Sequence, residues 1–95
     1  MIVNRRTWMV TETDKAVEML KEPTDYLGTL PPYRIYSSNI GTWSLVVLEQ
    51  EFENLAKYEQ FWDKFADAPE TPAFMEEWHK VTLPGGTNEI WNLEE

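Results

Sequence analysis

Hydrophobic and polar positions divide the first part of the chain into a strand and a short helix. Residues 2–10 are rich in β-branched and aromatic side chains, which favours a strand. A Thr/Glu/Thr/Asp cluster follows, and this composition is typical of a helix start. From Thr13 or Asp14 to Glu22 the apolar positions gather on one side. Pro23 should end this helix, because proline disfavours a helical residue before it.

The middle of the chain predicts an irregular loop followed by an antiparallel hairpin. Residues 22–32 are rich in proline and contain a glycine, which favours a surface loop that borders any functional cleft. Residues 33–40 and 43–52 are strand-forming runs around a turn at 39–42. Apolar residues occupy both parities of the second run, so both of its faces should be covered. The chain's own helices can cover one face, which predicts a second subunit on the other.

The last part of the chain predicts two helices and a strand. The apolar residues of the first helix recur at spacings of three and four, and they are Leu55, Tyr58, Phe61, Trp62 and Phe65. After a break at residues 68–72, a second apolar stripe consists of Phe74, Met75, Trp78 and Val81. We expect Pro84-Gly85-Gly86 to end this helix as a turn and C-cap. Residues 87–93 should then form the last strand.

The predicted order is strand, helix, strand, strand, broken helix, strand, over a single domain of residues 1–95. Two split βαβ units in this order give the ferredoxin-like α+β fold, with a four-stranded antiparallel sheet and helices on one face. Pairing two such sheets through their uncovered faces gives a dimeric α+β barrel. The expected partner is therefore a second copy of the chain, bound through the sheet face.

Composition and charge narrow the functional classes. With Lys+Arg 8 and Asp+Glu 17, the formal net charge is −9, so we expect neither nucleic acid nor an anionic membrane as a partner. No stretch approaches the roughly 20 apolar residues of a membrane span, and the start of the chain lacks the apolar segment of a signal peptide. The absence of cysteine excludes disulfides and thiolate chemistry and fits a cytoplasmic location.

His79 is the only histidine, so a metal site with several histidines is impossible within one subunit and no metal is expected. If His79 faces a cavity it could act as a general base; the alternative is an ordinary surface histidine. Gly85-Gly86 lacks a phosphate-loop sequence, and the serines lack a nucleophile elbow. Neither a nucleotide cofactor nor acyl-enzyme chemistry is therefore predicted.

Arg5 and Arg6 are adjacent on a predicted strand and must point to opposite faces of the sheet. A guanidinium is costly to bury alone, so each should pair with a glutamate from a neighbouring strand, with Glu49, Glu51 and Glu89 as candidates. The alternative is that a free guanidinium binds an anion.

Two parts of the chain resemble a known family. Residues 4–10 resemble the opening strand of NIPSNAP-like proteins, with Arg6 and Trp8 at the matching places. The family's second half is similar over residues 51–55, 66–69 and 74–78. The resemblance implies the dimeric α+β barrel superfamily, which includes small monooxygenases, isomerase-like and haem-handling enzymes and many proteins without an assigned activity. Asn4 stands where that family usually has an acidic residue. This departure weakens the functional role that the resemblance implies for Arg6.

Aromatic residues provide the candidate ligand site. Five tryptophans offer more flat apolar surface than a small core easily absorbs, so some should be buried by a ligand or a partner. The side chains expected to line a cavity, about half of which would be ordinary core, are Trp8, Tyr36, Trp43, Phe61, Trp62 and Trp78. His79 or Arg6 would orient the ligand.

Three functions fit these observations. The leading expectation is a homodimer that binds a small apolar or aromatic molecule between sheet and helices. The first alternative is a cofactor-independent monooxygenase or isomerase-like enzyme with His79 or Arg6 as catalytic residues, and it requires His79 to face a closed pocket. The second alternative is a non-catalytic assembly domain, in which the tryptophans pack together without a cavity of ligand size.

Overall fold

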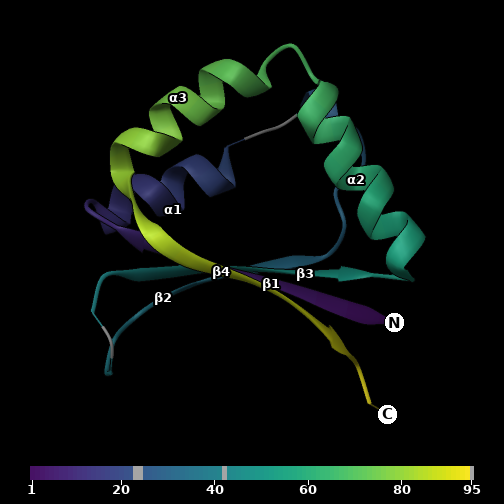
Figure 1. The fold of residues 1–95 in the computed structure, drawn as a ribbon, viewed down its shortest axis with the longest axis horizontal. Coiled ribbons are helices and arrows are strands. Elements are labelled where there is room, and N and C mark those ends of the chain that lie inside the picture. The colour runs from purple at the N-terminus through teal and green to yellow at the C-terminus, as the bar shows by residue number, and fades with distance from the viewer. Residues whose placement is uncertain (23–24, 42, 95) are drawn as a thin grey trace.

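The computed structural model describes residues 1–22, 25–41 and 43–94. The α-helices lie on one side of a four-stranded antiparallel sheet, and no described helix covers its other side (Figure 1). The strands are β1 (Ile2–Val10), β2 (Tyr33–Ser37), β3 (Leu45–Phe52) and β4 (Thr82–Asn92). The helices are α1 (Thr13–Lys21), α2 (Leu55–Asp67) and α3 (Thr71–Val81), with a short 3₁₀ helix η1 at Asp25–Leu27.

The strand order is β2-β3-β1-β4, and every neighbouring pair is antiparallel. This arrangement confirms the predicted ferredoxin-like α+β fold, and the predicted broken helix is α2 followed by α3. Asn54 caps α2, because its side chain accepts a hydrogen bond from the backbone N–H of Lys57. Among the described residues no helix is both long enough and apolar enough to cross a lipid bilayer.

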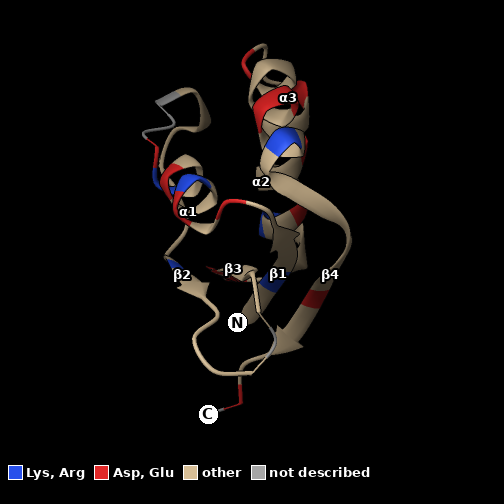
Figure 2. Ribbon diagram, turned by 90° about the vertical axis from the view of Figure 1, so that its left-hand side faces the viewer, with Lys and Arg blue, Asp and Glu red and all other residues tan. Residues whose placement is uncertain are grey.

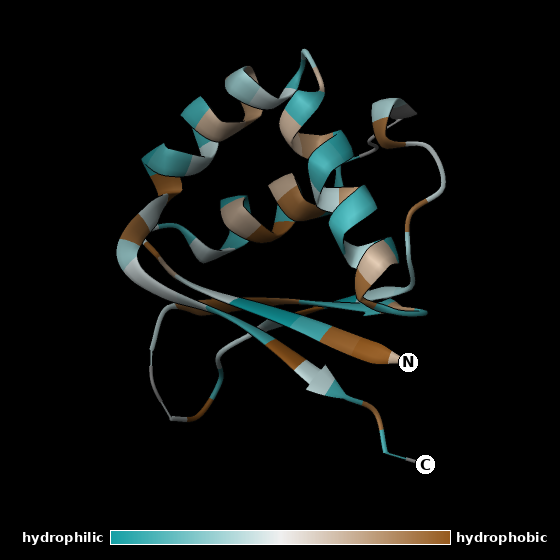
Figure 3. Cartoon of the chain, turned by 45° about the vertical axis from the view of Figure 1, so that its right-hand side comes forward, coloured by the Kyte–Doolittle hydropathy of each residue, from teal (hydrophilic) through white to brown (hydrophobic). Residues whose placement is uncertain are grey.

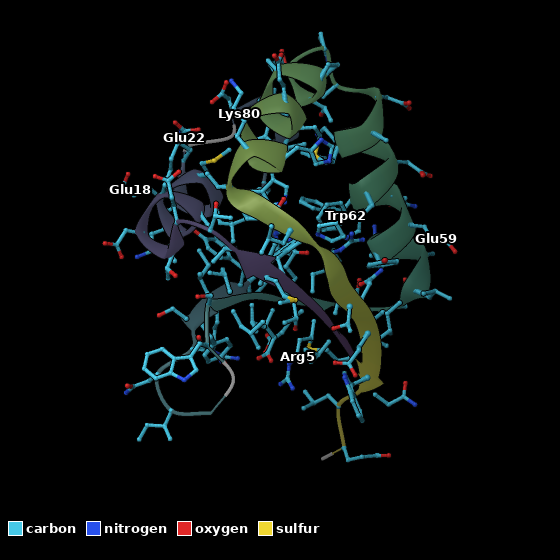
Figure 4. All side chains as sticks on the ribbon, turned by 60° about the vertical axis from the view of Figure 1, so that its left-hand side comes forward. Arg5, Glu18, Glu22, Glu59, Trp62 and Lys80 are labelled. Atoms are coloured by element: carbon cyan, nitrogen blue, oxygen red, sulfur yellow. The ribbon has the colours of Figure 1, made fainter. Side chains whose placement is uncertain are left out.

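Successive side chains along each strand point to opposite faces of the sheet. Arg6 faces the helices, since it contacts Tyr58 of α2, whereas Arg5 contacts Glu49 on the opposite face. In Figure 4 the Arg5 side chain extends away from the helices, while Trp62 lies on the inner side of α2. The prediction that the two arginines point to opposite faces is therefore confirmed. We call the face that carries Arg5 and Glu49 the open sheet face.

The hydrophobic core lies between the sheet and helices α1 and α3. Its buried residues are Val10, Ala16, Val46, Trp78 and Val81. In Figure 3 hydrophobic residues recur along the helices and strands between more hydrophilic ones, as amphipathic elements require. Helix α2 contributes no fully buried residue to this core, and its aromatic side chains are half-buried.

Pro84-Gly85-Gly86 lies inside β4, and the prediction that it ends the preceding helix is wrong. The pairing register between β4 and β1 shifts between Thr7 and Met9, so extra β4 residues bulge out of the ladder there. Gly85 has a φ of 106°, and a Cβ on Gly86 would collide with the Thr7 carbonyl oxygen. The two glycines therefore allow the backbone to form this β-bulge. Strand β4 begins five residues earlier than the predicted 87.

The hairpin between β2 and β3 has a longer connection than the predicted turn at 39–42, of which residue 42 lies outside the described residues. It extends on the side of the sheet away from the helices (Figure 1). Ser44 has a φ of 58°, which interrupts the extended conformation just before β3. Ile40 and Trp43 in this connection are 95% and 83% exposed.

Candidate functional site

A cavity of about 340 Å³ lies between the sheet and the helices. It is lined by residues from α1, α2, α3, η1 and the first three strands, and we call it the aromatic cavity. Arg6 is its only charged lining residue among those described. Tyr26 also lines it, and burial raises the pKa of this phenol, so the hydroxyl stays neutral. A volume of this size suits a small molecule.

Helices α2 and α3 turn their aromatic stripes toward this cavity. Ring contacts with centroid separations between 5.0 and 6.0 Å continue around its wall without interruption. In order they join Trp8, Trp78, Phe74, Phe65, Trp62, Phe61 and Phe52. Four of these six contacts are edge-to-face, Phe74 stacks on Trp78, and Phe52 is tilted against Phe61. Edge-to-face and stacked ring pairs are favourable beyond simple burial, so they hold the wall in one arrangement.

Four of the six predicted lining aromatics lie in this cavity, namely Trp8, Phe61, Trp62 and Trp78. Tyr36 and Trp43 lie outside it. The parity of β2 places Tyr36 on the open sheet face, where its hydroxyl donates to Glu49 at 3.3 Å. Trp43 precedes β3 and belongs to the exposed hairpin connection.

His79 lies at a second site. It is exposed on α3 and borders a cleft of about 620 Å³ between α3, β1 and β4, which we call the outer cleft. The outer cleft and the aromatic cavity share the side chains of Arg6, Trp8, Met75 and Trp78. These residues form the wall between the two spaces. His79 does not line the aromatic cavity.

Arg6 is held in a network of uncharged groups. Its Nε donates to Asn4 Oδ1 at 3.2 Å, and its Nη2 donates to Tyr58 Oη at 3.1 Å. Asn88 accepts from Asn4 at 2.6 Å and donates to Tyr58 at 3.3 Å. The guanidinium carbon lies 3.8 Å from the centre of the Trp62 ring. No described carboxylate lies within ion-pair distance of Arg6, so the predicted glutamate partner is absent there.

The predicted Arg–Glu pair is confirmed for Arg5. Its Nη2 lies 2.7 Å from Glu49 Oε2, and this hydrogen bond holds the pKa of the Glu49 carboxyl below its ordinary value. Arg34 lies 3.6 Å from both Glu49 and Glu51. The charges at the centre of the open sheet face are thus paired within one chain.

Two polar atoms beside the aromatic cavity are buried without a partner among the described residues. They are Gln50 Oε1, an acceptor, and Trp62 Nε1, a donor. Both residues line the cavity. No group of three or more His, Asp or Glu side chains within the described ranges is arranged to hold a metal ion.

Comparison with known proteins defines the fold. No family model matches the sequence, and no curated protein matches it. An uncharacterized NIPSNAP domain protein from Burkholderia xenovorans superposes with a TM-score of 0.78 at 20% identity, covering 99% of this chain and 95% of that one. A NIPSNAP family protein from Agrobacterium tumefaciens gives 0.78 at 19% identity, with 99% and 86% covered. The chain has the NIPSNAP fold.

A third structure extends the comparison beyond NIPSNAP proteins. An antibiotic biosynthesis monooxygenase superposes with a TM-score of 0.68 at 10% identity, covering 100% of both chains. Both results confirm the resemblance seen in the sequence at the level of the fold. At these identities they carry no residue role from one protein to another.

Within this NIPSNAP fold, several site residues were not found from the sequence. Gln50 shares the parity of Leu48 and Phe52, so a polar residue on a buried strand face was the available signal. Tyr58 was assigned to the apolar stripe, but its hydroxyl contacts Arg6. Asn4 is fully buried in the Arg6 network, and no pattern in the sequence distinguishes it from an edge-strand asparagine.

Proposed function

We propose that the protein is a homodimer that binds a small, largely aromatic or apolar molecule in the aromatic cavity of each subunit. One observation carries the binding part of this proposal: the unpaired atoms Gln50 Oε1 and Trp62 Nε1 belong to residues of a largely apolar wall. Leaving a buried polar atom without a partner costs about 1–3 kcal/mol. A ligand with a donor and an acceptor would supply both partners after small side-chain rotations.

The cavity volume supports binding over the assembly-only alternative. That alternative predicts tryptophans packed against each other without a space of ligand size, whereas the aromatic rings here line a space of about 340 Å³. Filling an apolar cavity of this size with a ligand stabilises the protein.

The same proposal includes a cytoplasmic location, which the cysteine-free composition supports.

The open sheet face supports the homodimer. It exposes Met9, Tyr36 and Trp91 to 38%, 45% and 54%. The connection between β2 and β3, which contains the highly exposed Ile40 and Trp43, runs on the same side of the sheet (Figure 1). Large exposed apolar patches mark interaction sites. Arg5, Arg34, Glu49 and Glu51 are already paired within the chain, so a partner could cover this face without isolating these four charges.

Charge distribution favours a second copy on this same face. The chain is strongly acidic, and Figure 2 shows acidic residues on α1 and α3, on the helical side of the molecule. The open sheet face carries Arg5 and Arg34 beside three glutamates, Glu49, Glu51 and Glu89. Two copies of this near-balanced face repel each other less than the helical surfaces would.

Ligand binding is tested by calorimetric titration with naphthalenemethanol and by native mass spectrometry of the purified protein. We expect saturable binding to the wild type and a retained small molecule in the spectrum. Leu20→Trp fills the cavity and should abolish binding, whereas the matched Leu55→Trp, at a half-exposed position on α2, should not. No heat and no retained mass in the wild type would overturn this part of the proposal.

The homodimer is tested by analytical ultracentrifugation at micromolar concentration. Val47→Glu places an unpaired charge on the open sheet face and should give monomers, because a buried lone charge is costly. Leu55→Glu, at a half-exposed position at the start of α2 and away from the open sheet face, should leave the dimer intact. A wild-type protein that sediments as a stable monomer contradicts the proposal.

A cofactor-independent monooxygenase or isomerase-like enzyme acting in the same cavity is the second candidate. The similarity in fold to a structure called an antibiotic biosynthesis monooxygenase favours it. Incubating the recovered ligand with the protein in air, while following oxygen uptake and product mass, tests this candidate. His79 lies in the outer cleft and does not line the aromatic cavity, so an enzyme in this cavity would depend on Arg6. Turnover that is lost in Arg6→Met while the protein remains folded supports this candidate. Oxygen uptake and product formation equal to a protein-free control would exclude it for that ligand.

A further inference from the structure

We infer that the molecule held in the aromatic cavity carries a negatively charged group, a carboxylate or a group of similar charge and geometry, and that Arg6 binds it. This inference rests on the proposed binding function and specifies its ligand class. Arg6 lines both the aromatic cavity and the outer cleft, so a ligand in either space can reach its guanidinium.

The geometry of Arg6 leaves donors free in a fixed orientation. A guanidinium has five N–H groups. Asn4 and Tyr58 accept from two of them, so three are left without an acceptor among the described residues. The Trp62 ring, 3.8 Å from the guanidinium carbon, supports one face of its plane. An oriented guanidinium with spare N–H groups matches the two oxygens of a carboxylate.

Neighbouring Arg5 shows what is missing at Arg6. Both arginines come from β1, but Arg5 is neutralised by Glu49 at 2.7 Å. Around Arg6, every hydrogen-bond partner in the described structure is uncharged. A half-buried cation with only neutral partners gains more from an anion than an exposed one would, because surrounding water screens it less.

The distribution of carboxylates around the cavity points the same way. The chain has 17 Asp and Glu residues, yet none of the acidic side chains that the structure describes lines the aromatic cavity or the outer cleft. A third cleft, between α1 and α3, is lined by three glutamates, Glu22, Glu70 and Glu77, and by one lysine, Lys15, so its charged side chains are acidic on balance. It shares Met19, Tyr26 and Phe74 with the aromatic cavity. Figure 4 shows Glu22 near α1 and Trp62 on α2, on different sides of the molecule.

The two ends of the aromatic cavity therefore differ in charge. An anionic group is repelled at the end with the glutamates and attracted at the end with Arg6. A ligand with an apolar body and one anionic end would place its charge beside Arg6 and its body among the aromatic rings. The anionic group of such a ligand would neutralise the Arg6 guanidinium, which has no acidic partner in the described cavity wall.

The experiment compares naphthoate with naphthalenemethanol, which share a ring system but differ in charge. In the wild type we expect calorimetry to give at least about tenfold tighter binding of naphthoate, as a charge-assisted bidentate contact provides. Arg6→Met should remove this preference while retaining binding of the alcohol. Arg6→Lys should retain part of it, because the charge remains and the fork is lost. Circular dichroism checks that each variant is folded.

Lys57→Met serves as the matched control. It removes one positive charge from α2, next to Tyr58, at an exposed position outside both the cavity and the cleft, so the preference for naphthoate should persist. Equal affinity of the wild type for the two compounds would overturn the inference while cavity binding stands. Persistence of the preference in folded Arg6→Met would overturn it as well. If neither compound binds to the wild type, the proposed function fails and this inference fails with it.

Discussion

Arg5 donates two hydrogen bonds to the same carboxylate oxygen of Glu49, from Nε at 3.1 Å and from Nη2 at 2.7 Å. The other oxygen of Glu49 accepts from the Tyr36 hydroxyl at 3.3 Å. Three strands, β1, β2 and β3, therefore meet at one carboxylate in the middle of the open sheet face. This carboxylate links the pH dependence of folding to the charge balance of the proposed dimer surface.

Glu49→Gln should make the protein less stable at neutral pH and less sensitive to acid. The folded-state pKa of Glu49 lies below the ordinary value of 4.5, so its carboxylate stabilises the folded state above pH 4.5. That contribution disappears as pH falls from 4.5 through the folded-state pKa. The loss at neutral pH should be about 1 kcal/mol, because water reaches the partly exposed Arg5 and screens the pair.

Urea denaturation at neutral pH and at about pH 3, at one fixed protein concentration, measures both effects. Glu18→Gln, at an exposed position on α1, is the control and should retain the wild-type acid sensitivity (Figure 4). If Glu49→Gln loses as much stability in acid as the wild type does, then Glu49 does not contribute to the acid sensitivity of the fold.

Gly86→Ala should destabilise the fold by about 1–3 kcal/mol, because its Cβ would meet the Thr7 carbonyl oxygen in the bulge between β4 and β1. Backbone cannot yield as a flexible side chain does, so β4 must shift. Thr87→Ala, one residue along the same strand, removes an exposed side chain and should change stability much less. Chemical denaturation compares the two variants, and equal stabilities would contradict this account of the bulge.

The strands and helices were predictable because their apolar periods are regular. Strand β1 was predicted at its observed bounds, and the stripe from Leu55 to Phe65 indicated α2. The error at Gly85-Gly86 has a physical cause: glycine after an apolar stripe fits a helix C-cap and a β-bulge equally well. The collision at Thr7 depends on the pairing of β1 with β4, which local sequence does not contain.

The site was harder to predict than the fold, because residues far apart in sequence form it. Aromatic composition identified Trp62 and Trp78, but the six predicted lining residues included Tyr36, which the register of β2 places on the open sheet face. The network of Asn4 with Asn88 joins the two ends of the chain and requires the pairing of β1 with β4. Such contacts follow from topology, not from local pattern.

Trp78→Ala should cost about 3–5 kcal/mol of folding stability. Trp78 is 4% exposed, lies edge-to-face with Trp8 at 5.0 Å and stacks on Phe74 at 5.9 Å. The change removes the ring that joins the core to the wall of the aromatic cavity, so ligand binding should be lost as well. Leu55→Ala, at a 50% exposed position, is the control and should cost well under half as much. Thermal or urea unfolding with comparable costs for the two variants would contradict the central position of Trp78.

Gln50→Met should stabilise the ligand-free protein and weaken ligand binding. The side chain of Gln50 is buried, and its Oε1 lacks a hydrogen-bond partner among the described residues. Methionine has a similar shape without a polar oxygen, so the variant should gain about 1–2 kcal/mol of folding stability. If Gln50 only stabilised the fold, its replacement would lower the folding stability, because favourable contacts would be lost.

Two measurements on Gln50→Met separate these possibilities. Urea denaturation without ligand should give a higher free energy of unfolding than the wild type, and calorimetry with naphthalenemethanol should give weaker binding, because the acceptor for its hydroxyl is gone. Tyr33→Phe, which removes one hydroxyl from another residue that lines the cavity and leaves the ring in place, is the matched control and should alter neither quantity as much. A variant that is less stable yet binds as the wild type does would assign Gln50 to the fold and leave the ligand's polar contacts to Trp62 and Arg6.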